Sequence, residues 1–149
     1  MKKLLWISLL FCSVAFANFQ VGDKLPAMTL QNQFGKTMKV DANDEMLLLT
    51  FEKEVAIKTA DLLKTKPKGY LKAQHIKYIS DISKMPSFIT SMFALPKMKK
   101  YPFSVMLIDN DLGKSFSKRE GKVTLYRLKK QKITAVQFVD PKELDSVLQ

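Results

Sequence analysis

Cysteine is nearly absent from the sequence, whose single example, Cys12, lies close to the start of the chain. Thiol catalysis needs a cysteine thiolate, and a structural zinc site needs clustered cysteines and histidines. The only histidine, His75, has neither a cysteine nor a patterned group of carboxylates around it in the sequence. Residues 18–149 therefore exclude disulfide bonds, cysteine chemistry and a Cys/His zinc site, and their stability must come from packing.

Glycine is scarce as well. The five glycines are scattered along the chain, at Gly22, Gly35, Gly69, Gly113 and Gly121. Their spacing matches neither a dinucleotide-binding fingerprint nor a phosphate-binding loop. We therefore expect no cofactor, although flavin sites often lack a short motif and a flavin-associated enzyme stays open as an alternative.

Arginine is the third scarce residue, since Arg119 and Arg127 are the only two and the net charge of +11 comes almost entirely from lysine. Arginine is the side chain best suited to grip a phosphate or carboxylate with two hydrogen bonds. We therefore interpret the lysines as a solvated surface and expect no nucleic-acid partner. The alternative is a basic protein that docks on anionic components of a cell envelope.

Long apolar runs are limited to the start of the chain. Two lysines precede an apolar stretch over residues 4–14, and the small-residue pattern Ala15-Phe16-Ala17 follows it. This pattern predicts a signal peptide over residues 1–17, cleaved between Ala17 and Asn18. The apolar stretch is too short to span a hydrocarbon core of about 30 Å. We expect one periplasmic or otherwise extracytoplasmic domain over residues 18–149, with no transmembrane segment after processing.

A buried strand that runs directly into a helix organises the rest of the sequence. The apolar run over residues 46–51 is typical of a central strand covered on both faces. After it, Ala56, Ala60 and Leu63 recur at the spacing of a helix that lies on a sheet. Glu52 and Glu54 stand where the partial positive charge of the helix N-terminus favours acidic side chains. The carboxyl end of such a strand is the usual functional crevice of an open α/β sheet.

The other expected elements follow from local patterns and predict an α/β fold. They are a β-hairpin over 27–30 and 37–40, a parallel strand over 76–79, a helix from Pro86 that Pro96 ends, a strand over 103–108, a turn over 109–114, a strand pair over 123–128 and 133–139, and a helix over 141–148 with a capping box from Asp140 and Glu143.

Three groups of side chains have two interpretations each. Glu52 and Glu54 could form an acid/base pair, but we favour ordinary acidic residues at a helix N-terminus. The pair Asp109 and Asp111 resembles the start of a calcium loop, but a hairpin turn fits the flanking strands better. The apolar residues Phe88, Met92 and Phe93 could form a pliable binding surface, although at helical spacing we favour a place in the core.

Four short motifs, taken together, resemble the thioredoxin-like superfamily and especially its redoxin and peroxiredoxin branch. They are Val21-Gly22-Asp23-Lys24-Leu25-Pro26, Leu48-Leu49-Thr50-Phe51, Tyr101-Pro102-Phe103, and Leu107-Ile108-Asp109 with Gly113-Lys114. The resemblance implies a three-layer sandwich with a central mixed sheet and an N-terminal β-hairpin over residues 18–149. It also implies a cis peptide bond between Tyr101 and Pro102.

The chain departs from that family at the position that decides function. The redox chemistry of the family needs a cysteine at the N-terminus of the first helix after the central strand, and residues 52–58 contain none. The resemblance therefore implies the fold without the thiol reaction, and no catalytic residue follows from it.

We predict instead a binding module for an envelope protein or peptide. The loop after Phe51 and the loop before Phe103 would lie side by side at one end of the sheet. Together they would form one surface lined by Glu52, Lys53, Glu54, Tyr101 and Pro102. The backbone beside Pro102 would pair with an extended peptide, as strand addition does. The alternative is a non-thiol oxidoreductase assisted by a cofactor.

Overall fold

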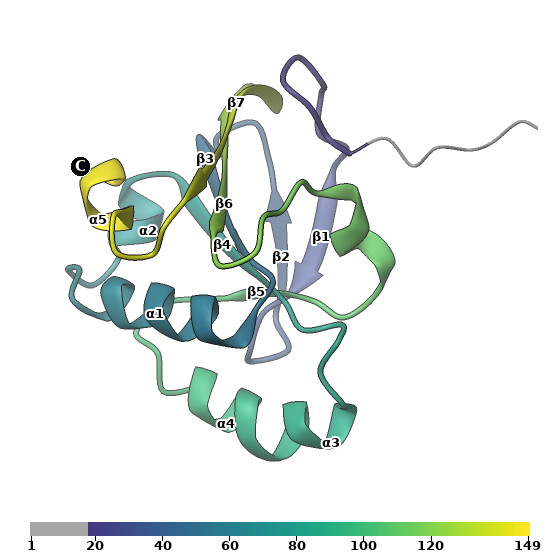
Figure 1. Cartoon of the computed structure of the whole chain (residues 1–149), viewed down its shortest axis with the longest axis vertical. Helices are drawn as coiled ribbons and strands as arrows, with labels where there is room; N and C mark the ends of the chain where they lie inside the picture. Colours follow the sequence, from purple (N-terminus) through teal and green to yellow (C-terminus); the bar gives the residue numbers. More distant parts are fainter. Residues whose placement is uncertain (1–17) are drawn as a thin grey trace, which may run out of the picture.

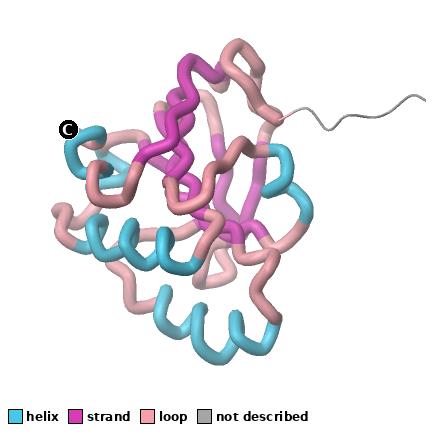
Figure 2. The backbone as a smooth tube through the Cα atoms, in the orientation of Figure 1, coloured by secondary structure: helices cyan, strands magenta, loops and turns pink. Residues whose placement is uncertain are grey.

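The computed structural model describes residues 18–149, so the predicted signal peptide lies outside the described part of the chain. A five-stranded mixed sheet forms its centre, in the order β5-β4-β3-β6-β7 (Figures 1 and 2). The strands are β3 (Met46–Thr50), β4 (Ile76–Asp81), β5 (Met106–Ile108), β6 (Val123–Lys129) and β7 (Lys132–Val139). The strands β3, β4 and β5 are parallel, and β6 and β7 complete the sheet as an antiparallel hairpin.

The central strand β3 is buried along its whole length, as its apolar run predicts. Successive side chains of a strand point to opposite faces, so Leu47 and Leu49 enter one apolar core while Leu48 enters the other. Both faces of the sheet are therefore covered.

Helices cover one face of the sheet (Figure 1). They are α1 (Lys53–Lys64), α2 (Tyr70–Ala73) and α5 (Leu144–Val147). A continuous helix made of α3 (Ser87–Ile89), η1 (Thr90–Ala94) and α4 (Leu95–Met98) lies next to α1 (Figure 1), and none of its residues is buried. The predicted stripe of α1 is confirmed at Ala60 and Leu63, which are buried with Val55. Leu63 shares a core cluster with Leu48 of β3.

A β-hairpin and a short 3₁₀ helix cover the other face. The hairpin joins β1 (Met28–Gln31) to β2 (Thr37–Val40), and η2 spans Asp111–Ser115. Met28, Val40 and Phe116 share a core cluster with Leu47 and Leu49. The predicted three-layer arrangement, with its mixed sheet and N-terminal hairpin, is confirmed.

The helix after Pro86 does not end at Pro96, contrary to the prediction. Pro96 lies inside α4, and one turn of π-helix, η1, precedes it. A proline within an α-helix clashes with the carbonyl four residues earlier and removes one hydrogen bond. Here the N–H of Leu95 donates to the carbonyl of Thr90, five residues back, and the widened turn accommodates Pro96. We call α3, η1 and α4 together the π-containing helix.

Three other local predictions were wrong. The strand predicted over 103–108 begins only at Met106, and the residues after it form η2 rather than a hairpin turn, because β5 and β6 each pair with a different strand. The last helix begins at Leu144 without a capping box. The Asp140 side chain accepts instead from the N–H of Lys142 at 2.9 Å, and this hydrogen bond lowers the pKa of Asp140.

The predicted cis bond between Tyr101 and Pro102 is also wrong, since no peptide bond in residues 18–149 is cis. The motif does not precede the strand that lies antiparallel beside β3. That strand is β6, and the residues before it form a turn in which Gly121 has a φ of 71°. The segment around Pro102 precedes β5, the parallel strand at the edge of the sheet.

Candidate functional site

A groove of about 470 Å³ with a mainly apolar base lies between α1 and the π-containing helix. We call it the interhelical groove. The two helices lie one above the other in Figure 1, and the ends of β3 and β4 lie at its base. Its lining includes Phe51, Glu52, Lys53, Ala56, Ile57, Tyr78, Ser80, Asp81, Ile82, Lys84, Met85, Ile89, Phe93, Ala94, Lys97, Met98, Tyr101 and Val105.

The groove contains three of the five predicted site residues. Glu52, Lys53 and Tyr101 line it, whereas Glu54 and Pro102 lie outside it. Glu52 precedes the first turn of α1, and the ring of Tyr101 lies 4.9 Å from the Nζ atom of Lys64 in the last turn. The predicted meeting of the two loops at one end of the sheet is therefore wrong, because β5 runs parallel to β3 and the residues before it lie toward the opposite end.

The loop before β6 reaches the N-terminus of α1, and Glu52 anchors it there. The N–H of Gly121, just before β6, donates to Glu52 Oε2 at 2.9 Å. This carboxylate therefore has a structural partner, and the exposed Glu54 does not line the groove with it. The arrangement agrees with ordinary acidic residues at a helix N-terminus rather than with an acid/base pair.

The backbone edge beside Pro102 is closed by a side chain that sequence reasoning missed. Gln33, which is only 2% exposed, donates from Nε2 to the carbonyl of Phe103 at 2.7 Å. Its Oε1 accepts from the N–H of Val105 at 2.8 Å. The amide of Gln33 thus occupies two backbone groups next to Pro102, which leaves fewer of them free for the predicted peptide pairing. A glutamine in a hairpin loop carries no local signal of such a contact.

The base of the groove holds buried hydroxyl groups. The hydroxyl of Tyr78 lies 3.3 Å from Thr50 Oγ1 and donates to the carbonyl of Ala56 at 3.4 Å, while Thr50 Oγ1 donates to Ser80 Oγ at 3.3 Å. Burial raises the pKa of Tyr78, against a smaller lowering by Thr50. The phenol therefore stays protonated at neutral pH and its bonds are internal, which makes this cluster a support for the groove.

Tyr101 is half-buried at the other end of the groove. Burial raises its pKa, and the neighbouring Lys64 ammonium partly opposes that shift. Its ring also packs on Phe103, with ring centroids 5.2 Å apart. Tyr101 thus presents an apolar ring at the groove while its hydroxyl stays neutral.

Large apolar side chains stand exposed on the π-containing helix. Phe88, Met92 and Phe93 are 61%, 66% and 62% exposed, so the favoured interpretation of these residues as core is wrong. These three residues are called the apolar patch below, and Phe93 belongs to the groove lining as well.

Positive charge surrounds the groove. Lys53, Lys84 and Lys97 line it and form no ion pair with any residue of 18–149. The two acidic residues of the lining are both engaged by backbone N–H groups: Glu52 by Gly121, and Asp81 by Ser83 at 2.9 Å. The groove therefore combines an apolar base with free ammonium groups at its rim.

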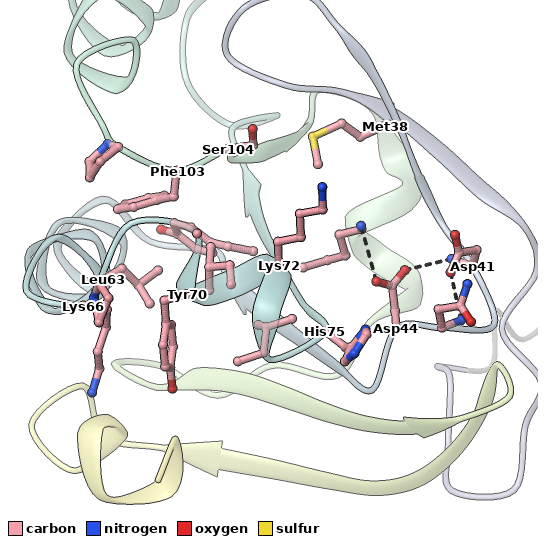
Figure 3. A pocket seen from close by; sticks show the side chains of 18 residues that line it. Met38, Asp41, Asp44, Leu63, Lys66, Tyr70, Lys72, His75, Phe103 and Ser104 are labelled. Atoms are coloured by element: carbon pink, nitrogen blue, oxygen red, sulfur yellow. Dashed lines mark hydrogen bonds and ion pairs between the residues drawn. The ribbon is translucent and has the colours of Figure 1, made fainter.

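A second pocket, of about 530 Å³, lies beyond the far end of α1 (Figure 3). Its apolar wall includes Tyr70 and Phe103. Asp44, which is buried, lies 3.3 Å from Lys77 Nζ and also accepts from the N–H of Asp41 at 2.8 Å. Of the lysines that line this pocket, Lys66 and Lys77 are in ion pairs and Lys72 forms none within residues 18–149, so it has fewer unpaired lysines than the interhelical groove.

Residues 18–149 lack two further features, a metal-binding cluster and a membrane-spanning helix. No three acidic, cysteine or histidine side chains gather there in a way that could hold a metal ion. Within the same residues, every helix is too short or too polar to cross a bilayer.

Comparison with known proteins adds a likeness of fold. No protein-family model and no curated protein matches the sequence. Among solved structures, peroxidoxin BcpB from Mycobacterium tuberculosis aligns with a TM-score of 0.57 at 14% identity, over 88% of this chain and 95% of that one. The thioredoxin domain of a thiol-disulfide oxidoreductase from Bacteroides vulgatus gives 0.55 at 16% identity, over 89% and 100%. A peroxiredoxin-like protein from Aquifex aeolicus gives 0.54 at 14% identity, over 88% and 85%. At such identities the likeness concerns the fold alone.

Proposed function

Residues 18–149 have the thioredoxin-like fold, and we propose that the protein is exported to a cell envelope, where it binds a segment of another protein in the interhelical groove. The proposal includes no thiol reaction, because these residues contain no cysteine. The names of the neighbours describe thiol chemistry, but residues 18–149 have no thiol group to perform it.

The observation that carries the proposal is the exposed apolar patch beside an apolar groove. Soluble proteins seldom leave neighbouring large apolar side chains in water unless the surface has a partner. Phe88, Met92 and Phe93 share one helix, and each is more than half exposed. Phe93 joins the patch to the groove, so that one partner can cover both.

The composition of the groove also favours binding over catalysis. Met85 and Met98 line it, and Met92 stands beside it in the patch. Methionine is flexible and polarizable, and it is frequent at surfaces that adapt to different apolar partners. The hydroxyls at the base have internal hydrogen bonds and provide no activated nucleophile.

Site-specific photo-cross-linking tests the proposal. A photoreactive phenylalanine analogue replaces Phe93 in one variant and Val21 in another. Val21 is a matched control, since it is 61% exposed and belongs to the segment before β1 that pairs with β7. In an envelope extract we expect a discrete cross-linked partner from position 93 and none from position 21.

Loss of that product when Phe88→Ser and Met92→Ser are added would support the assignment of the patch. Equal labelling from positions 93 and 21, or no product from position 93, would contradict the proposed function.

A further inference from the structure

We infer that the interhelical groove binds an amphipathic α-helix whose polar face is acidic, an inference that rests on the proposed binding function. The inference rests on three features of the groove. Its base is apolar and contains methionines, unpaired lysines stand along its rim, and the two helices that form its walls have equal length. Charge and backbone geometry each narrow the chemistry of the partner.

The charge around the groove selects an acidic partner. Lys53, Lys84 and Lys97 are unpaired within residues 18–149 and outnumber the two carboxylates of the lining, Glu52 and Asp81, each of which is held in place by a backbone N–H group. The whole segment from Ile82 to Ile108 contains four lysines and no acidic residue. Opposite charge on the partner would give pairs across the rim and steer the encounter.

The same charge argues against a second copy of this chain as the occupant. A second copy in the groove would bring its own π-containing helix, with Lys97 on it and Lys84 just before it, against the lysines of the first. Like charges placed opposite each other in an interface oppose binding. A partner with carboxylates flanking its apolar residues meets no such repulsion.

The walls of the groove select a helix over an extended strand. An extended peptide needs free backbone groups on its host, because its own N–H and C=O groups are unpaired. Both walls are helices, whose backbone groups are bonded internally, and Gln33 occupies the carbonyl of Phe103 and the N–H of Val105 near the end of the groove. A helical partner satisfies its own backbone and offers only side chains.

The length of the walls sets the length of the partner. The helix α1 has 12 residues, and the π-containing helix spans Ser87–Met98 beside it. Twelve residues of helix extend about 18 Å, so the groove accommodates about three turns of an added helix. Apolar anchors at positions i, i+3 or i+4, and i+7 of the partner would face the base.

Three synthetic peptides of about 16 residues, long enough to cover the predicted three turns, test this chemistry. All share one leucine-based apolar face. The first carries glutamates on its polar face, the second carries lysines in their place, and the third is the acidic peptide with a central proline that breaks the helix. Fluorescence anisotropy measures their affinity for the processed chain at low and high salt.

We expect the acidic helix to bind about tenfold more tightly than the basic helix at low salt, and added salt to reduce the difference. The triple change Lys53→Glu, Lys84→Glu and Lys97→Glu should reverse the preference. The control triple Lys24→Glu, Lys39→Glu and Lys129→Glu alters the net charge equally at exposed lysines outside the groove and should keep it.

The outcomes separate this inference from the proposed function. Equal affinity for the acidic and basic helices, equal loss in both triple variants, binding of the proline peptide as tight as that of the helix, or no binding of any peptide overturns the acidic-helix inference. Cross-linking from position 93 would still test the proposed function in each case. Formation of a dimer that Phe93→Ser dissociates would also overturn the acidic-helix inference, since a second copy of the chain would then occupy the groove.

Discussion

Replacement of Gln33 by leucine should destabilise the protein strongly, although the residue lies in a hairpin loop. The Gln33 amide donates to the carbonyl of Phe103 at 2.7 Å and accepts from the N–H of Val105 at 2.8 Å. Val105 is 1% exposed, so its N–H has no access to water once the glutamine is lost. An unsatisfied buried backbone group costs about 1–3 kcal/mol.

The carbonyl of Phe103 is less enclosed, and we assign it the lower part of that range. Together the two groups predict a loss of about 2–4 kcal/mol in the free energy of unfolding. With a urea dependence of about 2 kcal/mol per molar, the middle of the usual range, the urea midpoint should fall by about 1–2 M.

Gln31→Leu serves as the matched control, because Gln31 ends β1 with an exposed side chain. Equilibrium unfolding in urea, followed by circular dichroism, should place this variant within about 0.5 kcal/mol of wild type. If Gln33→Leu unfolds at the same urea concentration as Gln31→Leu, the Gln33 amide does not hold the segment before β5.

Four further predictions concern other parts of the chain. Gly113→Ala should cost about 1–3 kcal/mol by overpacking, since an added Cβ would lie 1.9 Å from Asp81 Oδ2, and the double variant with Asp81→Ala should recover most of this loss in urea unfolding. Burial raises the pKa of Tyr78, so above about pH 10 this phenol ionises in the unfolded chain while it stays protonated in the folded protein, and the free energy of unfolding should fall as pH rises. Tyr78→Phe should flatten that decline. The exported protein should begin at Asn18 by intact-mass measurement, and a retained Met1 would refute the signal-peptide prediction. The purified protein should leave insulin disulfides unreduced, and turnover that persists after contaminating reductases are removed would refute the absence of thiol chemistry.

Local patterns were enough to predict most elements of the fold. The strand β3 is buried on both faces and therefore reads as a continuous apolar run, whereas α1 is buried on one face and shows apolar residues at helical spacing. These two patterns are distinct in the sequence. The same holds for the hairpin of β1 and β2 and for the pair β6 and β7. The missing cysteine in residues 52–58 is likewise a fact of sequence that needs no structure.

Features that depend on long-range contacts could not be predicted. Periodicity indicates an apolar face on the helix after Pro86, but it does not say whether another element covers that face, and Phe93 is in fact exposed. The order and direction of strands in a sheet leave no local trace either. The prediction therefore placed the loop before Phe103 beside the loop after Phe51, although β5 lies at the sheet edge and runs parallel to β3. The Gln33 side chain bonds to backbone groups of residues that lie 70 and 72 positions later in the sequence.

Binding in the interhelical groove is tested most directly by the affinity of the segment that cross-links to position 93. Calorimetry would compare wild type, the triple variant Phe88→Ser, Met92→Ser and Phe93→Ser, and the control Val21→Ser. Burial of one large apolar side chain stabilises by about 1.5–3 kcal/mol, so the triple variant should bind at least about tenfold more weakly. Its thermal unfolding should stay close to wild type, because all three side chains are more than 60% exposed in the free protein. An affinity of the triple variant equal to that of wild type and Val21→Ser would contradict binding in the groove.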